Sequence, residues 1–158
     1  MGAPVLSARL TPLGIPLFDG YSTTISFNAD PDISFWEKTV TPPGIDGGDA
    51  IDHTTMHNST WRTLGPRSLK TLTEFTLTAA YDPDLYDEIC ALLNVATSIT
   101  VHFPDLSTLV FFGFLRLFEP GAHEEGAQPE CTITITPTNW DPVNLVESAP
   151  VMTETAGT

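Results

Sequence analysis

The 158-residue sequence has no long apolar run and no recognisable leader. No stretch approaches the roughly 18 to 20 apolar residues that cross a bilayer, so we expect a soluble chain without a membrane-spanning helix. The first basic residue, Arg9, follows the apolar pair Val5 and Leu6, and prolines interrupt the start of the chain. A signal peptide has the opposite order, with charge before an unbroken apolar stretch. We therefore expect synthesis and folding in a cytoplasm.

Cysteine is scarce, since Cys90 and Cys131 are the only two and neither belongs to a CxxC pair. In a reducing compartment such residues are more often small buried hydrophobes than disulfide partners, so we expect no disulfide. The same setting argues against glycosylation of Asn58, although NST formally matches the acceptor pattern.

Basic residues are few: 6 Lys and Arg stand against 20 Asp and Glu, for a formal net charge of −14. Such a chain repels phosphate backbones, which disfavours nucleic-acid recognition. Half of the bases, Arg62, Arg67 and Lys70, fall close together. They form either a solvated patch or a surface that meets an acidic region on another copy of the chain.

Enzyme motifs are also missing, because the sequence contains no GxSxG, HExxH, P-loop or GxGxxG, and we expect no enzyme and no cofactor. His53 and His57 are four residues apart in DHTTMHNSTW, but zinc needs a third protein ligand, which Asp49 or Asp52 would have to provide. The spacing of three from Asp46 through Asp52 does not match an EF-hand. We expect no metal site, and histidines that hydrogen-bond to backbone within a loop.

Most of the remaining sequence is predicted to form strands, because apolar and polar residues alternate along it. Segments 21–28 and 33–40, separated by the turn NADPD, are predicted to pair as a hairpin. The other predicted strands are 69–81, 98–103, 108–118 and 131–137, with the second and third of these forming another hairpin. Strand 108–118 is apolar on both faces, and Gly113 would allow a bend or bulge in it.

One helix, over about residues 83–94, is predicted from local signals. Asp82 suits the N-cap position and Pro83 the first turn. Apolar residues at helical spacing give one buried stripe, formed by Leu85, Ile89, Leu92 and Leu93. Together these elements predict a mainly β fold, a β-sandwich or small barrel of about six or seven strands with one flanking helix.

The predicted domain covers residues 21–142, with an arm or tail at each end. Residues 1–20 form an apolar, proline-interrupted N-terminal arm, and residues 143–158 form a small, polar C-terminal tail that we expect to be mobile. The loop 41–68 is too long for an ordinary connection, and it contains apolar residues that a solvated linker does not need. Arms and long loops are the usual means by which subunits exchange contacts.

We therefore interpret the loop 41–68 as an assembly loop that contacts other subunits. Met56 and Trp61 are its expected anchors. The candidate interface residues are Asp52, His53, Met56, His57, Trp61, Arg62, Leu64, Arg67 and Lys70.

Three runs of the sequence resemble the major tail tube proteins of long-tailed bacteriophages: GGDAIDHTTMHNSTWRTLGPRSLKTLTEFTLTAAYDPDLYDEI, ITVHFPDLSTLVFFGFLRLFEP and CTITITPTNWDP. The likeness covers about residues 20–142 and is one of order and composition. It implies a tail-tube-like fold, six-membered rings stacked into a hollow tube, and a place in the virion tail after assembly in the host cytoplasm. Genome DNA would pass through the lumen without specific binding. The tape measure, tail terminator and distal tail proteins would be further partners.

The resemblance also implies that the loop 41–68 bridges subunits around an acidic lumen. Six copies at −14 each would carry −84 formal charges, which would keep DNA from adhering. Arg62, Arg67 and Lys70 are the natural counterions within such a ring. The polar faces of the strands are the candidates for carboxylates that face the lumen.

Two other functions remain open at this point. The tube subunit of a contractile tail or a secretion-type injection machine would share the fold and much of the pattern. A monomeric β-sandwich that binds carbohydrate would use Trp36, Trp61 and Trp140 as stacking platforms. These tryptophans are far apart in the sequence, and such a module has no use for apolar arms.

Overall fold

The computed structural model describes residues 21–154. The N-terminal arm predicted for residues 1–20 and the last residues of the predicted tail, 155–158, lie outside the described residues. The main sheet consists of β1 (Thr24–Phe27), β2 (Trp36–Thr41), β7 (Phe75–Ala80), β8 (Thr97–His102), β9 (Thr108–Pro120), β10 (Glu130–Pro137) and β13 (Val151–Thr153).

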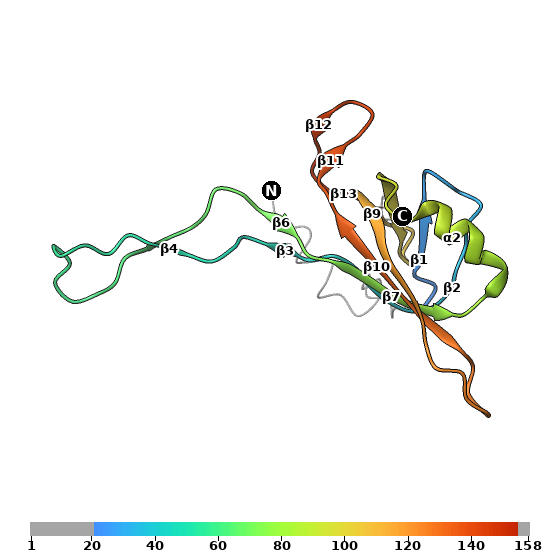
Figure 1. The fold of residues 1–158 in the computed structure, drawn as a ribbon. Coiled ribbons are helices and arrows are strands. Elements are labelled where there is room, and N and C mark those ends of the chain that lie inside the picture. The colour runs from blue at the N-terminus through green and yellow to red at the C-terminus, as the bar shows by residue number, and fades with distance from the viewer. Residues whose placement is uncertain (1–20, 155–158) are drawn as a thin grey trace, which may run out of the picture.

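This sheet is antiparallel, in the order β1-β8-β9-β10-β7-β2, with β13 also paired to β9 (Figure 1). It curls into a half-barrel around a single core. The curl brings the two edge strands near each other. The Ile25 backbone N–H on β1 donates to Glu37 Oε1 on β2 at 3.1 Å. The predicted mainly β fold with one short helix is confirmed.

The core follows the predicted alternation. On β7, Phe75, Leu77 and Ala79 are buried while the threonines between them are only half-buried. On β10, Ile133 and Ile135 face the same core. Full burial of each large side chain contributes roughly 1.5–3 kcal/mol, so the inner face of the central strands supplies most of the stability.

The predicted first hairpin is wrong, although both of its strands exist. β1 pairs with β8, and β2 pairs with β7, at opposite ends of the sheet order. Alternation specifies which face of a strand is buried but not which strand lies beside it. The predicted second hairpin is confirmed, since β8 pairs with β9 from Thr97↔Gly113 to His102↔Thr108.

The predicted helix forms as the 3-10 turn η1 (Pro83–Leu85) followed by α2 (Tyr86–Leu92). The Asp82 carboxylate accepts the Asp84 N–H at 3.0 Å, as an N-cap does. Ile89 and Leu92 are buried against the sheet, and Asn94 ends the segment at a φ of 62°. No helix among residues 21–154 is long and apolar enough to span a bilayer.

A β-bulge changes the facing of strand β9. Thr134 of β10 pairs with Leu117 and Ile135 with Leu115, which leaves Arg116 as an extra residue. Leu117 therefore points away from the core and is 37% exposed, although in strict alternation it would share the face of the buried Leu115. Gly113 has another role, because a Cβ there would lie 2.7 Å from the Thr136 carbonyl oxygen.

The C-terminal tail, expected to be mobile, contains structure. Val151–Thr153 form β13, which pairs with β9 beyond the point where β10 ends, at Val110, Leu109 and Thr108. Before it, β11 (Trp140–Asp141) and β12 (Val146–Glu147) form a small projecting hairpin (Figure 1).

The two cysteines differ in environment, and both are free. Cys131 is buried on β10, where burial raises the pKa of its thiol, so the expected small buried hydrophobe is confirmed there. Cys90 is exposed on α2, and the same expectation is wrong for it.

Threonines cross the sheet face opposite the core in two rows. Thr39, Thr78 and Thr132 are register partners across β2, β7 and β10. Thr41, Thr76 and Thr134 form the second row. These are among the polar strand faces that we considered for lumen carboxylates. They carry hydroxyls on β2, β7 and β10, and Glu119 on β9, the register partner of Thr132, adds a carboxylate to the first row.

Candidate assembly interface

The predicted assembly loop is a long two-stranded ribbon that leaves the body between β2 and β7; we name residues 42–73 the arm (Figure 1). Two short strand pairs hold it together: β3 (Ile45–Asp46) with β6 (Thr71–Leu72), and β4 (Ile51–Asp52) with β5 (Leu64–Gly65). From residue 44 to residue 71, every residue except Gly65 is exposed. The sequence of the arm shows no periodicity because neither face of the ribbon is buried.

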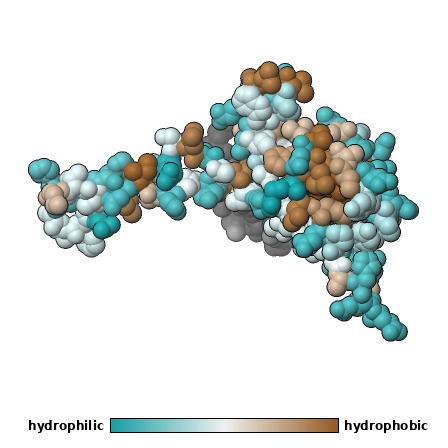
Figure 2. Space-filling model, viewed as in Figure 1, coloured by the Kyte–Doolittle hydropathy of each residue, from teal (hydrophilic) through white to brown (hydrophobic). Residues whose placement is uncertain are grey.

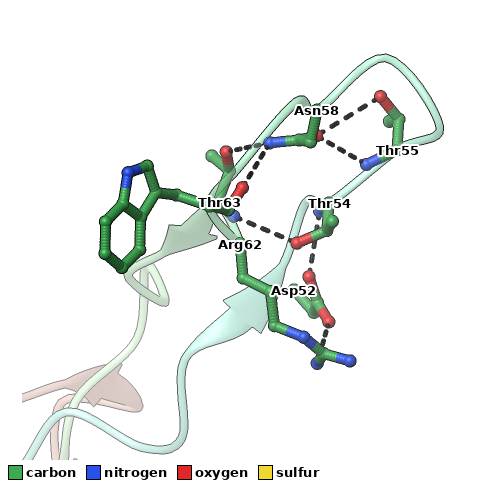
Figure 3. A network of polar contacts seen from close by, with 7 residues as sticks. Asp52, Thr54, Thr55, Asn58, Arg62 and Thr63 are labelled. Carbon is green, nitrogen blue, oxygen red and sulfur yellow. Dashed lines mark hydrogen bonds and ion pairs between the residues drawn. The ribbon is translucent and has the colours of Figure 1, made fainter.

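Polar contacts order the outer part of the arm (Figure 3). The Asn58 amide donates to the Trp61 carbonyl at 2.9 Å and to Thr63 Oγ1 at 2.8 Å, while its oxygen accepts the Thr55 N–H at 2.8 Å. The Asn58 side chain is thus fully used within the turn, which is the structural role of the residue in the NST pattern.

Asp52 and Arg62 join the two strands of the arm, with Arg62 Nη1 donating to Asp52 Oδ2 at 3.1 Å. Asp52 Oδ1 accepts the Thr54 N–H at 2.9 Å. Hydrogen bonds from Thr54 lower the pKa of the Asp52 carboxyl, and His53 adds a smaller electrostatic contribution in the same direction. The carboxylate therefore stays ionised throughout the neutral range.

The two histidines do not come together as metal ligands. The His53 N–H donates to the Thr63 carbonyl at 2.8 Å, and its ring lies over Gly65, where an added Cβ would meet it. The His57 N–H donates to Thr55 Oγ1 at 3.3 Å. Within residues 21–154 no three His, Cys, Asp or Glu side chains form a group that could hold a metal ion.

Large apolar side chains on the arm face solvent. Met56 is fully exposed, Trp61 is 82% exposed and Leu64 is 60% exposed. Ile45, Ile51 and Leu69 are exposed as well, and Figure 2 shows apolar groups along the arm between polar ones. Apolar groups gathered on an element without a core of its own indicate a contact surface.

The arm differs in charge from the rest of the chain. It contains three bases, Arg62, Arg67 and Lys70, and three acids, Asp46, Asp49 and Asp52, so its formal charge is zero and the rest of the chain carries −14. Arg67 donates from Nε to the Asp49 carbonyl oxygen at 2.7 Å. Because the arm has no net charge and carries three cations, it can approach an acidic neighbouring molecule without the repulsion that two acidic bodies exert on each other.

All nine predicted interface residues lie on the arm. A second exposed apolar surface was not predicted from the sequence. The β11–β12 hairpin exposes Val143, Leu145 and Val146 to solvent, with Trp140 half-exposed beside them. Asp141 shapes its turn by accepting the Val143 and Asn144 N–H groups at 2.9 and 3.2 Å. The turn residues DPVN between apolar neighbours are the signal that could have revealed this hairpin.

A groove of about 810 Å³ lies between the edge strands, lined by Tyr21, Trp36 and Tyr81 among others. The three tryptophans do not share it, because Trp36 lies on β2, Trp61 on the arm and Trp140 on β11, three elements that point apart (Figure 1). Among residues 21–154 the three tryptophans therefore do not form one shared stacking platform.

No family model and no curated protein matches this chain. Solved structures do match it. A chain of an extracellular contractile injection system, the PVC sheath–tube complex in the extended state, has a TM-score of 0.60 at 18% identity over 88% of this chain and 93% of that one. A chain from the tail of an empty gene transfer agent particle has a TM-score of 0.58 at 11% identity over 89% and 100%.

A chain from the anti-feeding prophage baseplate has a TM-score of 0.57 at 10% identity over 84% of this chain and 91% of that one. The chain has a tail-tube-like fold. At these identities the likeness is one of fold, and it extends over most of both chains in each comparison.

Proposed function

We propose that this chain is a structural subunit of a phage-like tail, and that it polymerises into a hollow tube of stacked six-membered rings. The observation that carries the proposal is the arm, a long exposed ribbon with apolar side chains that the body of the same chain does not cover. Neighbouring copies would cover these side chains, and the fold likeness to chains of tails and injection systems supports this assignment. No enzymatic role is part of the proposal.

The nine arm residues named above are proposed as subunit contacts. Met56 and Trp61 at the outer end would enter apolar sites on a neighbour, because large exposed side chains of this kind dominate interface energies. Arg62, Arg67 and Lys70 would reduce the repulsion between acidic bodies.

The proposed tube would carry genome DNA through an acidic lumen. Six copies at −14 each give −84 formal charges per ring, and a negative potential keeps a polyanion from adhering. Two of the central strands, β7 and β10, present threonines on the face opposite the core, so the acidic character would come mainly from loops, strand ends and the helix.

The tail of a long-tailed phage and a contractile apparatus are two forms of this proposal. The matched chain with a TM-score of 0.60 belongs to a sheath–tube complex, so the contractile alternative fits the comparisons at least as well. A non-contractile tail would add tape measure, tail terminator and distal tail proteins as partners in the virion. Recovery of a sheath protein with tubes from the native source would select the contractile form.

Imaging of the purified protein tests the proposal. We expect concentrated samples to form tubes with six-fold symmetry in negative stain and large species in size-exclusion chromatography. A species of 17.1 kDa at every concentration and salt would contradict it.

A matched control removes the arm without touching the core. The Thr73 N–H donates to the Gly44 carbonyl at 2.9 Å, so these residues face each other across the base of the ribbon. Replacing residues 46–71 with Asn-Gly, between the register partners Ile45 and Leu72, would close a short hairpin there and keep Leu72, which is buried in the core. We expect this variant to fold with the parent circular dichroism spectrum and to form no tubes.

A further inference from the structure

Exposed apolar side chains are concentrated in two parts of the described chain. Among residues 21–154, twelve of the eighteen large exposed hydrophobic residues belong to the arm or to residues 140–152, which we name the C-terminal patch. The arm contributes Ile45, Ile51, Met56, Trp61, Leu64 and Leu69. The C-terminal patch contributes Trp140, Val143, Leu145, Val146, Val151 and Met152. Two apolar surfaces of this kind on one subunit are suited to cover each other in an assembly.

Their charges are complementary. The C-terminal patch contains Asp141 and Glu147 and no base. The inner part of the arm presents Arg67 and Lys70 on either side of Leu69, which is 80% exposed. Within the part of the chain that the structure describes, no salt bridge involves Lys70 or Glu147. Each therefore retains a charge that a neighbouring molecule can pair.

The other acidic regions match the arm less well. The helix has Asp84, Asp87 and Glu88 but exposes only Tyr86 among large apolar residues. The β9–β10 turn has Glu124 and Glu125 with no exposed large apolar residue beside them. The C-terminal patch is the acidic region that also has an apolar surface.

The arm and the β11–β12 hairpin leave the body in different directions (Figure 1). The turn of the patch is also held in shape before any contact. Asp141 Oδ1 accepts the Val143 N–H at 2.9 Å, and Asp141 Oδ2 accepts the Asn144 amide at 2.7 Å. A preorganised turn loses little conformational freedom on binding.

We propose that the inner arm of one copy docks on the C-terminal patch of a neighbouring copy. Leu69 packs against Val143 and Val146, and Lys70 pairs with Glu147. The partner is a second copy of this chain, so the inference rests on the proposed function and identifies the receptor for part of the arm.

A charge exchange tests the pairing in solution. Lys70→Glu and Glu147→Lys are each expected to raise the critical concentration for polymerisation by roughly fivefold or more, the scale of a lost ion pair replaced by repulsion. The double variant restores opposite charges at each contact and should return to within about twofold of wild type, as expected for directly coupled residues. Glu125→Lys is the matched control, since it changes the net charge as Glu147→Lys does but lies outside the patch.

Cysteine crosslinking tests the contact directly and distinguishes contacts between chains from contacts within one chain. In a Cys90→Ser background, Leu69→Cys and Val146→Cys are placed on separate chains, and the two proteins are mixed before mild oxidation. Cys131 is buried and remains as it is. We expect a disulfide-linked dimer from the mixture and far less from either protein alone.

The outcomes separate the two proposals. A double variant no better than the single variants, or a mixture without a crosslink, in a protein whose wild type polymerises would overturn the docking while leaving the proposed function standing. A wild-type chain that never polymerises would overturn both.

Discussion

Arg62 and Asp52 lie on opposite strands of the arm and meet at 3.1 Å, far from the hydrophobic core. Together with the Asn58 contacts, this pair gives the ribbon a defined shape without apolar burial. The apolar side chains of the arm are thereby left for contacts with other molecules. Such an arrangement lowers the conformational entropy that assembly has to remove.

Trp61→Ala is expected to block tube formation while the monomer stays folded. Trp61 is 82% exposed, so its removal should change the free energy of unfolding by less than about 0.5 kcal/mol. Thermal unfolding and negative-stain imaging measure the two effects. Leu106→Ala, at a similarly exposed turn outside the arm, is the control and should polymerise normally. Tubes of normal length from Trp61→Ala would exclude Trp61 as an anchor.

The hydrogen bonds to the Asp52 carboxylate should be lost at a lower pH than the ordinary pKa of aspartate would predict. The folded-state pKa of Asp52 is lowered, so the contribution of the ionised form is present above the unfolded pKa and is lost only as the pH falls through the folded value. In an NMR titration, the Thr54 and Thr63 amide resonances should shift with a midpoint below the usual aspartate value of roughly pH 4. Asp52→Asn should remove the transition. A Thr54 midpoint at or above the ordinary value would contradict this account.

The bulge at Arg116 predicts different costs for two neighbouring leucines. Leu115 is fully buried, and Leu115→Ala should lower the free energy of unfolding by about 2–5 kcal/mol. Leu117 points outward, and Leu117→Ala should cost less than about 1 kcal/mol. Chemical denaturation of the monomer, or of the variant without the arm, measures both. Equal costs would mean that β9 keeps its alternation without a bulge.

Gly113→Ala should destabilise the sheet where β9 meets the end of β10. The new Cβ would lie 2.7 Å from the Thr136 carbonyl oxygen and 3.2 Å from the Pro137 Cα, so backbone has to shift. We expect a loss of about 1–3 kcal/mol in the free energy of unfolding, the usual scale of overpacking. Gly47→Ala is the control, because a Cβ there meets nothing within 4 Å.

Local signals predicted the elements of the fold well. The alternation of Phe75, Leu77 and Ala79 and the capping of the helix by Asp82 depend on residues close together in the chain, and the structure confirms both. The pairing of β1 with β8 and of β13 with β9 depends on partners far away in the sequence. Alternation contains no information about such partners, which is why the first hairpin was wrong.

The candidate site was predicted only in part. The apolar residues of the loop, above all Met56 and Trp61, predicted a contact surface. The structure places both of them on the arm, exposed to solvent. The hairpin at Trp140 was missed because its strands, β11 and β12, have two residues each, too short for any periodicity.

The threonine rows have a consequence for how water and ions meet this sheet. Hydroxyl groups hold water by hydrogen bonds but attract no counterion cloud, and the charges at the border of the rows are partly paired, Lys38 with Glu130 at 2.7 Å and Arg116 with Glu74 at 3.0 Å. The wetting of the threonine rows should therefore depend little on ionic strength, although the chain as a whole carries a formal net charge of −14. A filament built from this chain would combine threonine rows whose hydration depends little on salt with charged loops whose electrostatic interactions depend strongly on it.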